Sequence, residues 1–101
     1  MLVRLSLLAL AACCPAATIS QDIHAWSARN LPQYRKLVDE RFAAPEGQET
    51  RANAYRSMAS LVCTADTAEG KKDSPACACH HAASDAETSA RCKSFFDSLS
   101  P

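Results

Sequence analysis

The stretch CACHHAASDAETSARC, residues 77–92, holds three of the four cysteines that lie outside the N-terminal region, the fourth being Cys63. A domain of about 80 residues buries only roughly 60% of the surface that its unfolded chain exposes. Small exported domains therefore usually add covalent cross-links. The even number of cysteines predicts two disulfides in the C-terminal half of the chain.

Four cysteines can form two disulfides in three ways. A bond between Cys77 and Cys79 would close a very tight ring, which disfavours that pairing and the Cys63–Cys92 bond that goes with it. Two alternatives stay open, Cys63–Cys77 with Cys79–Cys92 and Cys63–Cys79 with Cys77–Cys92. Either would join residues 74–83 to the helices on both sides, and each ring of about 15 residues contributes on the order of 3 kcal/mol.

Before residue 44, apolar residues recur at the three- and four-residue steps typical of amphipathic helices. The Ser20-Gln21-Asp22 stretch predicts a short helix that ends near Asn30, and Pro32 suits the first turn of the next helix. We expect a core face on this second helix and expect the large aromatic residues of the whole chain to be buried. The residues concerned are Leu31, Tyr34, Leu37, Val38 and Phe42, together with Trp26, Phe95 and Phe96.

After the break at Ala44-Pro45-Glu46-Gly47, the pattern predicts a helix from about Gln48 to about Ala65, and then an exposed loop. Ser74-Pro75 can restart a helix, and Ser84 with Glu87 forms a capping box. In the last helix Thr88, Cys92, Phe95 and Leu99 share one face. Strand signals are scarce and the chain has two glycines. We therefore predict an all-α fold, a small bundle of three or four short helices stapled by disulfides in its C-terminal half.

The N-terminus has the layout of a signal peptide, with one positive charge at Arg4 followed by an apolar run from Leu5 to Ala12. At roughly ten residues this run is too short to cross a bilayer as a helix, which takes about 20 residues. Cleavage is therefore expected.

The motif Leu10-Ala11-Ala12-Cys13 resembles the lipobox of bacterial lipoproteins. The resemblance implies that the Cys13 thiol receives a diacylglycerol, that the chain is cut before Cys13, and that two or more acyl chains hold it in the membrane. Because Cys14, and not Asp, follows, the resemblance implies the outer membrane where the host has two. The expected organisation is a signal peptide at 1–12, a lipidated anchor and tether at 13–20, and a helical domain at 21–101.

An ordinary secretory signal, cut after Ala16 or Ala17, is the alternative. It would remove Cys13 and Cys14 and leave a freely secreted, disulfide-stabilised small protein. In the lipoprotein interpretation, Cys14 is a spare small residue near the lipid surface.

The net charge of the chain limits the classes of partner that it can bind. Lys and Arg number 11, so removal of Arg4 leaves 10 basic against 11 acidic side chains in a chain that starts at Cys13. Nucleic-acid binding needs a basic footprint, which this balance does not indicate. We expect contact with the membrane through lipid on Cys13, and no cofactor.

The CACHH stretch gathers soft metal ligands. In an extended chain Cys77, Cys79 and His81 would share one side, and two thiolates with an imidazole suit copper(I) or zinc. The spacing does not match a structural zinc site or a haem attachment motif. We therefore interpret Cys77 and Cys79 as disulfide cysteines beside exposed histidines, with metal binding by Cys77, Cys79, His80 and His81 as the alternative. The isolated His24 is expected to be a surface or packing residue.

No phosphate-binding glycine loop, nucleophile elbow or HExxH motif is present, so we assign no catalytic residue and predict a protein that is not an enzyme. The size, the lipobox and the closing ARCKSFF stretch, residues 90–96, resemble small exclusion lipoproteins of conjugative plasmids, which block a second transfer apparatus. The resemblance implies a membrane-anchored interaction or exclusion module with a protein partner in the cell envelope.

Overall fold

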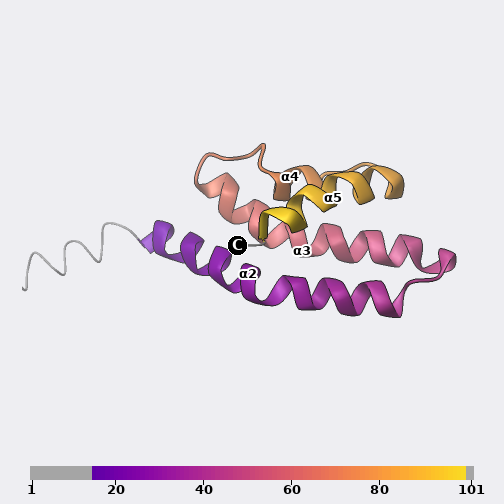
Figure 1. Ribbon diagram of the computed structural model, residues 1–101. Coiled ribbons are helices and arrows are strands. Elements are labelled where there is room, and N and C mark those ends of the chain that lie inside the picture. Colours follow the sequence, from indigo (N-terminus) through magenta and orange to yellow (C-terminus); the bar gives the residue numbers. More distant parts are fainter. Residues whose placement is uncertain (1–14, 100–101) are drawn as a thin grey trace, which may run out of the picture.

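The computed structural model describes residues 15–99, with side chains from residue 19 onward, and this part of the chain is all-α. Helix α2 spans Pro15–Arg41, a 3-10 turn (η1) spans Pro45–Gly47, and helices α3, α4 and α5 span Gln48–Ala68, Pro75–His80 and Asp85–Leu99. Helices α2 and α3 lie side by side as a hairpin, and α4 with α5 covers the other side of α3 (Figure 1). The predicted helical bundle is confirmed.

The sequence predicted a tether followed by two separate helices in the N-terminal part of the chain. The structure instead has one continuous helix, α2, of 27 residues. Residues 15–20, assigned above to a tether, form its first turns; proline is tolerated in a first helical turn, as at Pro15. Pro32 does not end the helix, although it has no N–H to donate to the preceding turn. The helix bends near its middle (Figure 1), and it continues because Leu31 is buried against the core on one side of the proline and Val38 is half-buried on the other.

The connection from α2 to α3 depends on Gly47. A Cβ atom at this position would lie 2.9 Å from the backbone oxygen of Phe42 and 3.0 Å from its Cβ, so a larger residue would push the turn away from the end of α2. The Arg51 side chain donates a hydrogen bond to the same Phe42 oxygen. Helix α3 continues to Ala68, three residues beyond the predicted end at Ala65, and Gly70 follows it with a φ of 82° that favours glycine.

The core lies between α3, α4 and α5. Phe95 and Cys92 are fully buried, and the Phe96 ring packs edge-on against the half-buried Tyr55 with ring centroids 5.1 Å apart. The predicted buried face of α5 is confirmed. Ser74 and Ser84 start their helices as predicted, accepting hydrogen bonds from the backbone N–H groups of Cys77 and Glu87 at 3.3 and 3.1 Å.

The disulfides are Cys63–Cys77 and Cys79–Cys92, with Cα–Cα distances of 4.6 and 4.5 Å. This is one of the two pairings that the sequence left open. Helix α4 selects it, because residues two apart on a helix point about 200° apart. Cys77 is therefore directed to α3, and Cys79 to α5.

The expected burial of the aromatic residues is confirmed for Phe95 and Phe96, but it is wrong for Trp26 and Tyr34 of α2. Trp26 is 40% exposed, Tyr34 is 51% exposed, and Leu37, expected in the same core face, is 60% exposed. Within the described part of the chain α2 packs mainly on α3, so one side of the helix meets the core and its other apolar residues stay outside.

Candidate functional site

An apolar stripe runs along one exposed side of α2, next to the side that packs on the core. It consists of Ile19, Trp26, Tyr34 and Leu37, all between 40% and 60% exposed, and is called the α2 stripe below. At 100° per residue, Ile19, Trp26 and Leu37 fall within about 20° of one another around the helix axis. The Trp26 and Tyr34 rings lie 6.4 Å apart between centroids, so the stripe is continuous across the middle of the helix.

Charged side chains of both signs flank the α2 stripe. Asp22, Arg29, Lys36 and Glu40 are all exposed on the same helix. Across residues 15–99, none of the helices combines the length and the apolarity that a membrane crossing requires. Large apolar residues that are exposed together on one side of a helix indicate an interaction surface.

A second group of side chains lies where the start of α2 faces the end of α3. His24 Nε2 is 2.8 Å from Asp66 Oδ1, and a carboxylate oxygen of Glu69 lies within 4.8 Å of both of these atoms. Asp66 is 6% exposed, whereas His24 is partly exposed and Glu69 follows the last residue of α3. We call His24, Asp66 and Glu69 the His–Asp–Glu cluster.

The electrostatics of this cluster centre on Glu69. The nearby Ser20 hydroxyl lowers the pKa of the Glu69 carboxyl, with smaller contributions from Lys71 and His24. The contact to Ser20 does not reach hydrogen-bond geometry, so the Ser20 Oγ, in a residue only 2% exposed, is left without a hydrogen-bond partner. Lys71 Nζ lies 3.7 Å from Glu69 Oε2 and is the nearby permanent cation.

A pocket of about 420 Å³ opens beside the cluster. His24 and Asp66 line it together with mostly apolar residues from all four helices, among them Ala28, Val62, Ala76 and Leu99. The imidazole and the buried carboxylate are therefore reachable from solvent.

The CACHH residues do not form the soft-ligand site considered above. Cys77 and Cys79 are bonded to different partners, so neither sulfur is a free thiolate. His80 Nδ1 lies 3.1 Å from the backbone oxygen of Arg56, and the His80 and His81 rings lie 4.8 Å apart between centroids, tilted by 56°. Both histidines follow the disulfide cysteines directly. His81 is exposed, as the disulfide interpretation predicts, whereas His80 is half-buried.

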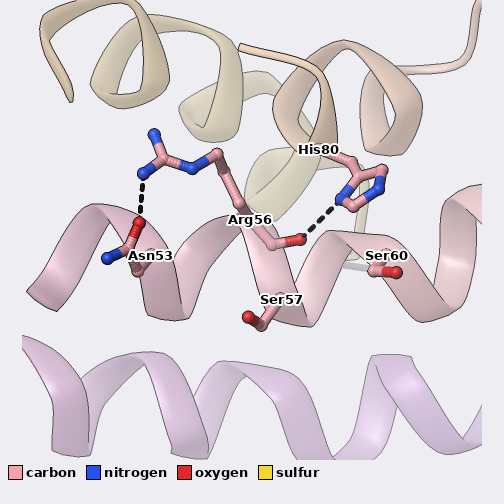
Figure 2. A pocket seen from close by; sticks show the side chains of 5 residues that line it. All are labelled: Asn53, Arg56, Ser57, Ser60 and His80. Atoms are coloured by element: carbon pink, nitrogen blue, oxygen red, sulfur yellow. Dashed lines mark hydrogen bonds between the residues drawn. The ribbon is translucent and has the colours of Figure 1, made fainter. Parts of the chain in front are cut away.

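The groove shown in Figure 2 lies between α3 and α4 and is lined by Asn53, Arg56, Ser57, Ser60 and His80. The charged group in the groove, the Arg56 guanidinium, already contacts other side chains of the domain. The Arg56 guanidinium donates to Asn53 and to Thr88, and it lies 3.6 Å from Asp85. These contacts hold α3 to α5, so we interpret the groove as a structural junction.

The expected lipidation residue Cys13 and its neighbour Cys14 lie outside the described residues. Sequence reasoning missed the His–Asp–Glu cluster, because His24 is far from the other two in sequence. The Asp66-x-x-Glu69 spacing could have indicated it, because residues three apart on a helix lie side by side and both carboxylates fall at the predicted end of the helix.

Comparisons of the whole chain with known proteins find no matching family model, no matching curated protein and no matching solved structure.

Proposed function

We propose that the protein is a non-enzymatic, lipid-anchored module of the cell envelope that binds a helix of another envelope protein along the α2 stripe. The stripe is the observation that carries this proposal. It exposes two aromatic and two aliphatic side chains, whereas among the described residues outside α2 Leu61 is the one large apolar residue that is exposed to a similar degree. Trp and Tyr are the residue types that interface cores favour.

The lipobox motif supports an anchor at Cys13, close to the start of α2. Cys13 precedes the first residue of α2 by two positions and the stripe residue Ile19 by six. Acyl chains on Cys13 would hold the start of α2 at the membrane, so that a partner contacting the stripe would also belong to the envelope. The two disulfides are consistent with an oxidising, exported location.

A protein helix fits the stripe better than a lipid surface does. From Ile19 to Leu37 the stripe extends over about 27 Å at 1.5 Å per residue, a length that suits a helix laid along α2. Its flanks carry Asp22 and Glu40 as well as Arg29 and Lys36. Anionic lipid favours uniformly basic flanks, whereas a rim of mixed charge is typical of protein interfaces.

The resemblance to exclusion lipoproteins gives this binding a specific purpose. An anchored module whose stripe occupies a helix of a transfer apparatus would block that apparatus. Two other functions remain as alternatives. Metal binding by Cys77, Cys79, His80 and His81 would require reduction of both disulfides, and free secretion would require cleavage beyond Cys14.

Mass spectrometry of the mature N-terminus tests the anchor. We expect acylated Cys13 as the first residue, and release of the protein from membranes when Cys13 is changed to Ala. Cys14→Ala is the matched control, since it changes the neighbouring thiol and keeps the lipobox cysteine. A mature chain that begins near Thr18 would overturn the anchor and favour secretion.

Site-specific photocrosslinking tests the stripe. A photoreactive residue at Leu37 is expected to capture one protein, identifiable by mass spectrometry, whereas the same probe at the exposed Ser94 of α5 is not. The identified partner, once purified, should bind the wild-type chain and lose at least about tenfold in affinity for Leu37→Asp. Crosslinks to a second copy of this chain, or to lipid alone, would contradict the proposed partner.

A further inference from the structure

The inward side of α2 carries a feature that does not depend on lipid anchoring or on the α2 stripe. His24, Asp66 and Glu69 bring one imidazole nitrogen and two carboxylate oxygens within 4.8 Å of one another. We propose that the His–Asp–Glu cluster is a binding site for one divalent transition-metal ion, and that Zn²⁺ is the ion it suits best.

The donor set favours this choice. Zn²⁺ binds His nitrogen and carboxylate oxygen at about 2.0–2.2 Å, and sites with three protein ligands complete a tetrahedron with water. One neutral imidazole and two carboxylates supply the two negative charges that a divalent ion needs. The imidazole nitrogen disfavours Mg²⁺ and Ca²⁺, because both ions prefer oxygen ligands alone.

Side-chain movements alone can bring the three ligand atoms to the spacing that an ion needs. Ligand atoms about 2.0–2.1 Å from a tetrahedral ion lie roughly 3.3 Å apart. His24 Nε2 and Asp66 Oδ1, now 2.8 Å apart, would separate by about 0.5 Å to reach that spacing. The Glu69 oxygen, which lies within 4.8 Å of the other two atoms, would approach by up to about 1.5 Å. The His24 side chain is 41% exposed and can turn, and Glu69 lies past the end of α3, so two adjustable ligands meet one buried and fixed carboxylate.

Ser20 provides an independent indication that the site takes a polar ligand. This residue is 2% exposed, its hydroxyl has no hydrogen-bond partner, and it lies one helical turn before His24, beside the Glu69 carboxylate. A buried hydroxyl normally has a partner. A water molecule in the fourth position of the ion would provide one.

The helix end adds a favourable field. The C-terminal end of a helix carries partial negative charge, which stabilises a cation. The last turn of α3 contains no basic residue, and Asp66 and Glu69 lie at that end. Lys71 Nζ, 3.7 Å from Glu69 Oε2, is the cation that a metal would displace.

The direct 2.8 Å contact between His24 and Asp66 accounts for two of these residues without any metal, so the experiment must separate this contact from metal binding. The mature chain, with disulfides intact and any free thiol alkylated, is titrated with Zn²⁺ by calorimetry. We expect one ion per chain, with micromolar or tighter affinity, and an upward shift in Tm of at least about 5 °C at saturating Zn²⁺. Substitution of Zn²⁺ by Co²⁺ should give the intense visible absorption of a tetrahedral site.

Variants assign the ligands. His24→Gln, Asp66→Asn and Glu69→Gln are each expected to weaken Zn²⁺ binding at least tenfold. Glu69→Gln changes an exposed side chain, so folding is retained and the test stays valid even if Asp66→Asn unfolds the protein. His81→Gln, at an exposed histidine outside the cluster, is the matched control and should bind as the wild type does.

Lys71→Ala separates a metal site from an ion pair. It removes the cation that competes for Glu69 and is expected to tighten Zn²⁺ binding about twofold to tenfold. Absence of saturable binding at 100-fold excess of Zn²⁺ over protein would overturn the proposal. Binding that survives His24→Gln and disappears in His81→Gln would overturn it as well.

Discussion

The C-terminal half of the domain and helix α2 use their apolar side chains in opposite ways. Helix α5 buries Phe95, Phe96 and Leu99, each 8% exposed or less, against α3 and α4. Along the described side chains of α2, Leu31 is the one large apolar residue that is buried to this degree. The C-terminal half therefore contains most of the core, and α2 lies on its surface.

The two regions are also held by different interactions. Disulfides tie α4 to α3 and to α5. Helix α2 is held by Leu31 in the core and by contacts of its charged side chains. His24 Nε2 lies 2.8 Å from Asp66 Oδ1, Asp39 accepts from the Tyr55 hydroxyl, and the Arg35 guanidinium lies 4.5 Å from the centre of the Phe96 ring. Covalent links let a small core suffice, and this leaves the apolar side chains of α2 available for a partner.

Phe95→Ala should produce the largest loss of stability. The Phe95 ring is fully buried, and its removal leaves a cavity in the middle of the core, so we expect the free energy of unfolding to fall by about 3–5 kcal/mol. Urea unfolding followed by circular dichroism measures the change. Trp26→Ala on α2 is the comparison, since it removes an even larger ring that is 40% exposed; an equal loss there would contradict the contrast between the two regions.

Removal of the Cys79–Cys92 bond comes next. With a sequence separation of 13, a chain-entropy estimate gives a loss of about 2–4 kcal/mol for the Cys79→Ala, Cys92→Ala double variant. Non-reducing denaturant melts measure it. The double variant of Cys63 and Cys77, with a separation of 14, should lose a similar amount, because both bonds hold α4. If either variant unfolds as the wild type does, the disulfides do not substitute for a larger core.

A matched pair of leucines sharpens the comparison. Leu99→Ala, at 8% exposure, should lower the free energy of unfolding by about 2 kcal/mol, because a nearly buried side chain leaves a partly open cavity. Leu37→Ala, at 60% exposure, should change it by no more than about 0.5 kcal/mol. Thermal melts of the two variants side by side measure the difference. A large loss for Leu37→Ala would mean that the α2 stripe supports the fold.

The sequence predicted the C-terminal half better than α2, and the reason is physical. In α5, buried residues recur at helical spacing on one face, so Thr88, Cys92, Phe95 and Leu99 could be identified from periodicity alone. In α2, apolar residues lie on two faces, and periodicity cannot say which face meets the core. The choice depends on α3, whose position relative to α2 is set by the turn at Gly47.

Two further features needed the three-dimensional structure. The disulfide pairing depends on α4 being helical, and a six-residue segment containing Cys77 and Cys79 carries little helical signal beyond its Ser74 cap. The His–Asp–Glu cluster depends on the start of α2 facing the end of α3. Continuation of α2 through Pro32 was also missed, because the cost of a proline inside a helix is offset here by packing on both sides of it.

The smallest expected effect concerns the polar contact between α3 and α2. Burial, and then the Asp39 carboxylate that accepts its hydrogen bond, raise the pKa of Tyr55 above its ordinary value of 10.0. The folded chain therefore holds the Tyr55 proton more tightly than the unfolded chain does. The contribution of Tyr55 to the free energy of unfolding is complete below a pH of about 10, and it is lost as the pH rises through the folded pKa. Tyr55→Phe should flatten the alkaline decrease in the free energy of unfolding, measured by urea melts from pH 8 upward, with Tyr34→Phe on the exposed side of α2 as the matched control. Identical alkaline profiles for Tyr55→Phe and the wild type would mean that the phenol does not link the two helices.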